Sequence, residues 1–485
     1  MLICTPVNDD AEARYTCACH SPAFARLNAA IERRFSRRSF LAGAGAIGAM
    51  ALSPKSATAA VPRAPTGPVV FTNVRIFDGK SASLIAGRNL IVEGNRIKAI
   101  AAAGERPPEG AQIIDGGGRT LMPGLIDAHW HTVMCGIPEV VALTADVPYV
   151  HLVAAQQAEQ TLMRGFTTIR DVGGPSFALK RAIDQGMFAG PRIFPSGAMI
   201  SQTSGHGDFR LRYEVPRGSA NDISHAEAAG ISAVADGVPE VLRRVREQLL
   251  LGASQIKIMT GGGVSSAYDP IDVNQFTAEE IRAAANAASD WGTYVCSHVY
   301  TPDGIKRALQ NGVRCIEHGQ LADEDAVKMM ADKGAWWSLQ PFLADEDSNP
   351  KSNPVQRQQQ EEIAKGTVRA YELTKKHKVK TAWGTDILFN PKGVANQGKQ
   401  LTKLSRWFDN ADVLRMATAA NGELLAMSGE RNPYRAKVGV IEPGALADVL
   451  LVDGNPLENL ALIADPEPNL KVIMKDGRIF KNTLA

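Results

Sequence analysis

Polar residues of metal-binding types stand at the end of an apolar run near the start of the chain's central region. Residues 121–131 read LMPGLIDAHWH and place Asp127, His129 and His131 at every second position. Side chains alternate between the two faces of a strand, so these three point to one side. Because buried imidazoles need partners, the two histidines predict a bound group between them, and we expect Asp127 to orient a ligand rather than to be one.

Four later apolar runs also end on potential ligands. Lys257 lies in QIKIM, His298 in VCSHVY, His318 in CIEHG and Asp386 in AWGTDI. If these runs are parallel strands of one closed barrel, their carboxyl ends meet at a single mouth. Together with the first two histidines they would form a two-metal site. The alternative, separately satisfied core residues, requires a coincidence of position at every strand.

Such a ligand set predicts hydrolysis, because divalent cations activate water and polarise a carbonyl group. We expect Asp386 to take a proton from the attacking water and return it to the leaving amine. The ammonium of Lys257 has no lone pair and cannot be a ligand. It could become one only after burial has favoured its neutral amine.

The elements that would position these residues alternate between strands and helices. Eight apolar runs fall in this region: LMPGLIDAHWH, FTTIRDV, RIFPSG, QIKIM, YVCSHVY, RCIEHG, WWSLQP and TAWGTD. They predict an α/β fold, a (β/α)8 TIM barrel over residues 121–427. Short turn-rich strands in residues 61–120 and 428–485 predict a small composite β-sandwich domain built from both chain ends.

The first 60 residues differ in character from the rest. Arg37 and Arg38 precede a short run of small apolar residues and a small-x-small site at 57–59, which resembles a bacterial twin-arginine export signal. We therefore expect residues 1–60 to be a leader and the protein to be exported to the periplasm. The cysteines beyond this leader are odd in number and widely spaced, so no disulfide framework is expected.

Composition excludes other classes of function. The chain has 485 residues, of which 45% are hydrophobic and 21% charged, as in soluble globular proteins. Its formal net charge is +2 and no basic stripe is present, so a nucleic-acid partner is not expected. Beyond the leader we expect no membrane-spanning segment and no membrane partner.

Two residues lie on loops expected to overhang the barrel mouth. His206 in ISQTSGHGDFR follows the third strand, and Tyr268 in GGGVSSAYDP follows the fourth. Both offer donors for an oxyanion or a free carboxylate, with loop anchoring as the alternative role. The loops show no cluster of acidic residues, and Asp269 and Asp272 are the nearest acids, which favours a neutral or hydrophobic leaving residue such as Pro or Phe.

Structural roles, rather than catalytic ones, are expected for some other residues of the barrel region. We expect Arg170 and Asp171, which follow each other in GFTTIRDVGG, to form a structural pair. Tryptophans 336 and 337 are expected in the core.

The motifs together resemble the amidohydrolase superfamily, within it the imidazolonepropionase-like and Xaa-Pro dipeptidase group, which includes ochratoxin-degrading amidohydrolases. The similarity covers about residues 69–480 and runs in order through GLIDAHWH, GFTTIRDVGG, GPRIFPSG, SGHGD, IKIMTGGGVSSAYDP, IEHG, WGTD and EPGALADVLLVD. It implies a (β/α)8 barrel with a composite β-sandwich, and homo-oligomers such as octamers.

The resemblance also implies a role for each candidate residue. His129, His131 and Asp386 would hold the more buried metal, and His298 and His318 the more exposed one. N-carboxylated Lys257 would bridge the two divalent metal ions, for which zinc is favoured. His206 and Tyr268 would contact the substrate carbonyl or its terminal carboxylate.

The expected function is hydrolysis of the amide bond to a C-terminal amino acid in a dipeptide or other small molecule. N-acyl-Phe compounds such as ochratoxin A are a narrower expectation from the resemblance. A mononuclear deaminase or imidazolone-type cyclic amide hydrolase is a second hypothesis, although a one-metal site needs no bridging Lys257. A non-catalytic assembly or binding relative is a third, against which the complete ligand set argues.

Overall fold

The structure is a computed structural model that describes residues 61–215, 222–266 and 269–484. The predicted leader, residues 1–60, and Tyr268 lie outside the described residues. Within the described part of the chain, no helix combines the length and the apolar composition that crossing a membrane requires.

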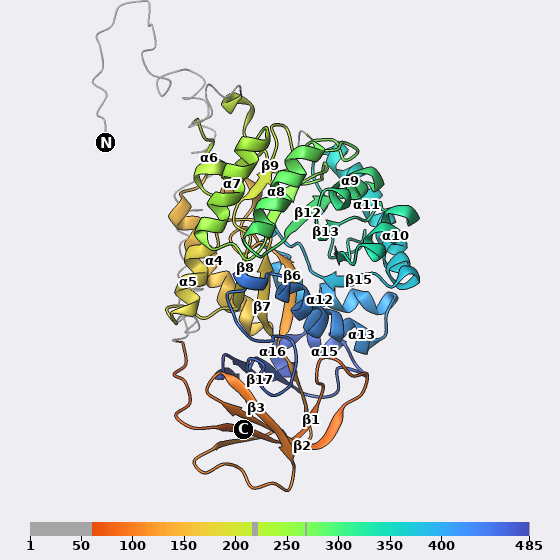
Figure 1. The fold of residues 1–485 in the computed structure, drawn as a ribbon. Coiled ribbons are helices and arrows are strands. Elements are labelled where there is room, and N and C mark those ends of the chain that lie inside the picture. Colours follow the sequence, from red (N-terminus) through yellow and green to blue (C-terminus); the bar gives the residue numbers. More distant parts are fainter. Residues whose placement is uncertain (1–60, 216–221, 267–268, 485) are drawn as a thin grey trace, which may run out of the picture. The chain divides into compact units, whose positions relative to one another are not determined.

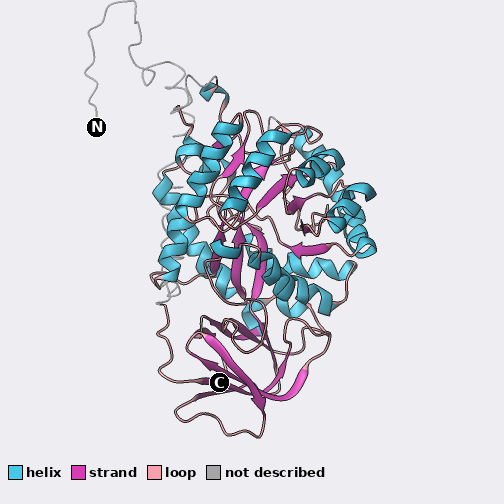
Figure 2. Cartoon of the chain, in the orientation of Figure 1, coloured by secondary structure: helices cyan, strands magenta, loops and turns pink. Residues whose placement is uncertain are grey.

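Eight parallel strands form the barrel (Figures 1 and 2). Seven lie within the predicted runs, and the last begins one residue before its run. They are β6 (Leu125–Trp130), β7 (Phe166–Asp171), β8 (Arg192–Pro195), β11 (Ile256–Met259), β12 (Val295–Val299), β13 (Cys315–His318), β14 (Trp336–Leu339) and β15 (Lys380–Trp383). The hydrogen-bonded ladders run β6-β7-β8 and β11-β12-β13-β14-β15. Two short strands, β9 (Met199–Ser201) and β10 (Ser232–Val234), extend the second ladder beyond β11. The predicted fold class is confirmed.

Buried side-chain amides bridge the two interruptions in the barrel ladder. Asn421 Nδ2 donates to the carbonyl oxygens of Ile126 in β6 and Trp383 in β15, each at 2.8 Å, and the Trp383 amide donates back to Asn421 Oδ1 at 3.1 Å. On the other side, Gln255 beside β11 donates to the carbonyl oxygen of Phe194 in β8 at 2.9 Å. These amides satisfy backbone groups that have no strand partner.

Helices connect the strands and cover the outside of the barrel (Figure 2). They are α3 (Glu139–Thr144), α4 (Val147–Met163), α5 (Phe177–Asp184), α6 (His225–Ala228), α7 (Val238–Leu251), α8 (Ala278–Asp290), α9 (Pro302–Gln310), α10 (Glu324–Asp332), α11 (Pro354–His377), α12 (Gln397–Thr402), α13 (Asn410–Arg415) and α14 (Asn421–Ala426). Helix α8 shows why they form: Thr277 and Glu280 make a capping box at its start, and Ile281, Ala284 and Ala288 share its buried face.

Strands from both parts of the chain outside the barrel form one eight-stranded sheet. The earlier part supplies β1 (Val69–Ile76), β2 (Ile85–Glu93), β3 (Arg96–Ala102), β4 (Gln112–Asp115) and β5 (Thr120–Pro123), and the later part supplies β16 (Val449–Val452), β17 (Leu470–Lys475) and β18 (Arg478–Asn482). The order is β18-β17-β16-β5-β1-β2-β3, with β4 paired to β1. Because β16 pairs with β5, the two parts are joined by main-chain hydrogen bonds. Two short helices, α15 (Ala461–Ala464) and α16 (Pro466–Asn469), precede β17.

A buried ion pair links this β domain to the barrel. Arg192 in β8 donates to the Asp448 carboxylate at 2.9 and 3.2 Å and to Asp476 at 2.7 Å. Burial alone would lower the pKa of Arg192, but the two carboxylates raise it above its usual value. The guanidinium is therefore charged and paired.

Candidate metal centre

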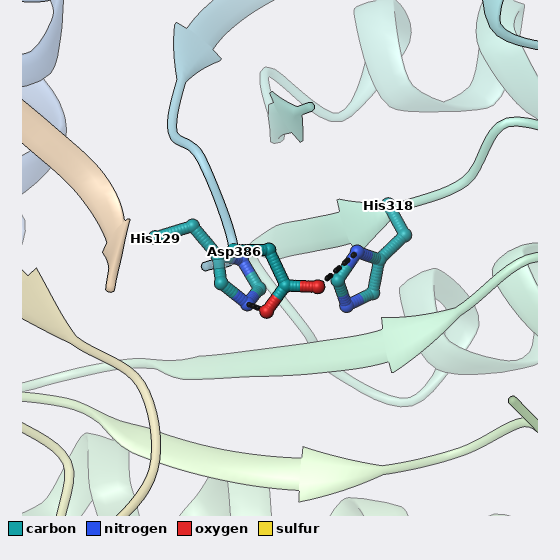
Figure 3. Close-up of side chains that lie close together, drawn as sticks. All are labelled: His129, His318 and Asp386. Atoms are coloured by element: carbon teal, nitrogen blue, oxygen red, sulfur yellow. Dashed lines mark ion pairs between the residues drawn. The ribbon is translucent and has the colours of Figure 1, made fainter. Parts of the chain in front are cut away.

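Side chains from three separate barrel segments meet at one point (Figure 3). His129 is the penultimate residue of β6, His318 is the last residue of β13, and Asp386 follows β15. The ligand atoms of these three residues lie within 4.8 Å of one another, and the Asp386 carboxylate lies between the two imidazoles. His129 Nε2 is 3.2 Å and His131 Nε2 3.1 Å from Asp386 Oδ1. Sequence positions from 129 to 386 are thus brought together as expected of a barrel mouth.

His298 and Lys257 lie beside this group. The ring centroids of His298 and His318 are 4.5 Å apart. Lys257 in β11 is buried, and Met259, two residues on, is paired with His298 in β12. Burial lowers the pKa of His298 and of His318 well below its usual value. Both imidazoles are therefore neutral, the form that binds metals.

Each of the four imidazoles has one nitrogen occupied by a protein acceptor. The pairs are His129 Nδ1 with Glu317 Oε2 at 2.7 Å, His131 Nδ1 with the Gly173 carbonyl oxygen at 3.0 Å, His298 Nε2 with the Gly262 carbonyl oxygen at 3.1 Å, and His318 Nδ1 with Gln340 Oε1 at 2.8 Å. Tautomers assigned from these partners place the proton on the occupied nitrogen. The second nitrogen of each ring then keeps its lone pair, as in metal-binding histidines, and that of His131 lies 3.1 Å from Asp386 Oδ1.

The second nitrogen of His129 shows that the residues fit a cation. His129 Nε2 is buried and has no hydrogen-bond partner among the described residues, because its 3.2 Å approach to Asp386 Oδ1 lacks hydrogen-bond geometry. Burial alone would raise the pKa of Asp386, but His129 and its neighbouring imidazoles hold it well below its usual range. A lone pair facing an ionised carboxylate is the donor set that divalent cations such as zinc bind.

Strained backbone supports a functional role for two of these residues. His318 has a φ of 71° and Asp386 a φ of 53°, the left-handed region that non-glycine residues seldom adopt. Such strain persists where surrounding structure holds a residue in a functional position.

Asp127 orients the site through the backbone, in agreement with its expected role. Its Oδ1 accepts from the backbone amides of His129 and Thr385, each at 3.1 Å, and its Oδ2 accepts from the Thr385 hydroxyl at 2.8 Å and from Gln397 at 2.9 Å. It therefore ties β6 to the turn that carries Asp386.

His206 packs directly against a candidate ligand. Its ring is stacked on that of His298, with centroids 4.0 Å apart. His206 Nδ1 lies 3.0 Å from Asp269 Oδ2 and 3.1 Å from the Ser266 hydroxyl, which leaves Nε2 as its remaining polar atom. The structure thus places His206 at the site, whereas its predicted companion Tyr268 lies outside the described residues.

A cavity of about 270 Å³ opens beside Asp386. Its wall includes the apolar side chains of Phe342, Ile363 and Ile387, and its lining also includes Lys351 and Arg357. A space of this size and mixed character is suited to a small organic molecule.

Comparison with known proteins identifies the family. Residues 120–480 match the family model described as the amidohydrolase family. This chain belongs to the amidohydrolase family. The amidohydrolase is 30% identical over 378 residues to the ochratoxinase of Aspergillus niger, a match that covers 74% of this chain and 75% of that protein. The predicted enzyme class, a hydrolase, is confirmed.

Solved structures agree with this assignment. A crystal structure of an amidohydrolase is 36% identical with a TM-score of 0.79, and a prolidase complexed with N-methylphosphonate-L-proline is 33% identical with a TM-score of 0.78. Each match covers 86% of this amidohydrolase and 100% of the other chain.

The expected pair of Arg170 and Asp171 is wrong. Asp171 accepts from the backbone amides of Thr132 at 2.9 Å and Gly173 at 3.2 Å. Arg170 instead donates to Glu317 Oε1 at 2.6 Å. Neighbouring residues of a strand point to opposite faces, which is why these two cannot meet.

Sequence reasoning also missed Glu317 and Tyr300. Burial alone would raise the pKa of Glu317, but Arg170 and His129 hold it well below its usual range, so it is a charged acceptor. Its position directly before His318 in CIEHG was the available signal, because a carboxylate in a buried strand needs a partner. Tyr300 lines the cavity, and its ring lies 5.0 Å from that of His298. Burial raises the pKa of Tyr300 well above its usual value, so it is a neutral donor.

Proposed function

We propose that this amidohydrolase uses two divalent metal ions to cleave the amide bond to a C-terminal amino acid. The observation that carries the proposal is the cluster of four imidazoles at the Asp386 site, each with one nitrogen bonded to an acceptor outside the cluster, in which the buried Nε2 of His129 has no hydrogen-bond partner among the described residues. The similarities to an ochratoxinase and to a prolidase support an amide substrate.

The ligand assignment follows the grouping that the family resemblance implies. His129, His131 and Asp386 hold one metal, and His298 and His318 hold the other. N-carboxylated Lys257 joins them, and zinc is the favoured ion. When bound, the metals supply an activated water and polarise the substrate carbonyl.

The surroundings of Lys257 support its modification. Its side chain is buried, and within the described residues no hydrogen bond or ion pair engages its ammonium group. An unpaired buried cation is costly, whereas an anionic carbamate between two cations is stabilised. Lys257 thus contributes a bridging anion and lowers the positive charge of the site.

Asp386 carries the proton transfer. Its carboxylate is ionised, lies beside the imidazoles and lines the cavity in which a substrate fits. It accepts the proton of the attacking water and delivers it to the leaving amine, a role worth about 10²- to 10⁴-fold in rate. Asp386→Asn should show a loss of this size with its metals retained, and near-normal turnover with both metals in place would remove this role.

The cavity supports a leaving residue that is neutral or hydrophobic. Its lining includes the apolar side chains of Phe342, Ile363 and Ile387. Of the acidic side chains in its lining, Asp347 is paired with Lys403 at 3.5 Å, and Glu361 shares the lining with the cationic Lys351 and Arg357. Proline or phenylalanine, including the phenylalanine of ochratoxin A, is therefore favoured over lysine or arginine.

A matched substrate panel tests this proposal. It contains Xaa-Pro, Xaa-Phe, Xaa-Lys and Xaa-Arg dipeptides, N-acyl-Phe compounds, and simple lactones and phosphotriesters. We expect hydrolysis of the Pro, Phe or N-acyl-Phe compounds. Preference for basic leaving residues would reject the cavity argument, and activity confined to lactones or phosphotriesters would reject the peptidase assignment. Export through the leader and homo-oligomer formation remain predictions from the sequence.

A further inference from the structure

Buried polar contacts connect three barrel strands behind the proposed metal centre. Arg170 in β7 donates through Nη2 to Glu317 Oε1 in β13 at 2.6 Å. Glu317 Oε2 lies 2.7 Å from Nδ1 of His129 in β6. All three residues are 0% exposed, so bulk water does not compete for these contacts.

The guanidinium of Arg170 is itself held in one orientation. Its Nε donates to the Ala128 carbonyl oxygen at 2.6 Å, and Nη1 donates to the Tyr294 hydroxyl at 3.1 Å. Nη2 also donates to the Ser338 hydroxyl at 3.3 Å. Because the guanidinium is planar and rigid, these contacts fix the direction of the donor that faces Glu317.

We propose that Arg170 and Glu317 position His129 for metal binding by fixing its tautomer. The inference rests on the proposed role of His129 as a metal ligand. A carboxylate has two acceptor oxygens, and Arg170 occupies one of them together with the weakly donating Cys315 thiol at 3.1 Å. The other accepts Nδ1–H of His129, which leaves the lone pair on Nε2, the atom beside Asp386. Neither Arg170 nor Glu317 needs to touch the metal or the substrate, so both are positioning residues.

Glu317→Gln separates this role from packing. The amide has nearly the same shape as the carboxylate but only one acceptor oxygen. Since Arg170 offers donors alone, that oxygen turns toward Arg170, and the amide NH₂ faces His129 Nδ1. His129 must then accept at Nδ1 and carry its proton on Nε2, the nitrogen assigned to the metal.

The measured quantity is zinc affinity, determined by competition with a chromophoric chelator on the full chain. We expect Glu317→Gln to bind zinc about 10- to 100-fold more weakly than the unsubstituted protein. The double variant Arg170→Met with Glu317→Gln removes the charged donor that captures the amide oxygen and leaves only the weak thiol donor of Cys315 on that side. That oxygen can then accept from His129, so the double variant should bind zinc more tightly than Glu317→Gln alone.

Asp448→Asn is the matched control, because it also neutralises a buried carboxylate paired with an arginine, Arg192. It should lower the thermal unfolding temperature and leave zinc affinity unchanged. If Glu317→Gln behaves in the same way, the inference is overturned. If His129→Ala also leaves zinc affinity unchanged, the metal assignment in the proposed function fails instead.

Discussion

Gly384, in the motif WGTD, allows the segment after β15 to lie directly against β6. A Cβ at this position would stand 2.4 Å from the backbone nitrogen of His129, 2.5 Å from its Cβ and 2.8 Å from its Cα. Ordinary van der Waals contact begins at 3.4 Å, so a methyl group lacks about 1 Å of space. Most of the obstructing atoms are backbone, which cannot turn aside as a flexible side chain could.

Gly384→Ala should therefore displace His129 relative to Asp386. The Asp386 amide donates to the His129 carbonyl oxygen at 2.8 Å, so a shift of either segment disturbs both proposed ligands. Overpacking of this kind costs about 1–3 kcal/mol of unfolding free energy. A misplacement of about 1 Å at the reacting groups costs on the order of 100-fold in turnover.

The assay combines kcat on an N-acyl-Phe or Xaa-Pro substrate, zinc affinity, and the free energy of unfolding in urea. Gly104→Ala is the control, because a Cβ there meets no atom within 4 Å and should change stability by less than about 0.5 kcal/mol. Loss of stability in Gly384→Ala with unchanged zinc affinity and kcat would refute the view that this close approach assembles the site.

Two further substitutions test the Asn421 bridge between β6 and β15 and the proposed bridging ligand Lys257. Asn421→Ala leaves the carbonyl oxygen of Ile126 and both backbone groups of Trp383 without these bonds, which should cost about 3 kcal/mol or more in urea unfolding; an unfolding free energy within about 1 kcal/mol of the parent protein would contradict the bridging role. Lys257→Ala should lose the metal pair and the activity together, as measured by metal analysis and turnover. Full activity of that variant with one tightly bound metal would count against the two-metal assignment.

The barrel strands could be predicted because each is a short apolar run bounded by turns. A strand buried on both faces needs such a run, and polar residues at its carboxyl end stand out against it. His129, His298, His318 and Asp386 were recognisable for this reason. Their convergence followed from the predicted barrel topology and did not require knowledge of side-chain contacts.

Partners across the barrel interior could not be predicted in the same way. The contact between Arg170 and Glu317 joins strands that are far apart in sequence, and only the tertiary structure specifies it. Sequence proximity suggested Asp171 instead, although strand alternation argues against that pair. Asn421 was equally inaccessible, because its bonds to β6 and β15 depend on where the last helices return to the barrel.

Metal content measured together with turnover tests the central claim most directly. The protein is purified, its divalent metals are counted per chain, and hydrolysis of the best amide substrate is followed before and after treatment with a chelator. The account predicts about two metals per chain, loss of hydrolysis when they are removed, and recovery when zinc is returned. Undiminished hydrolysis by protein that holds no metal, or only one, would contradict it.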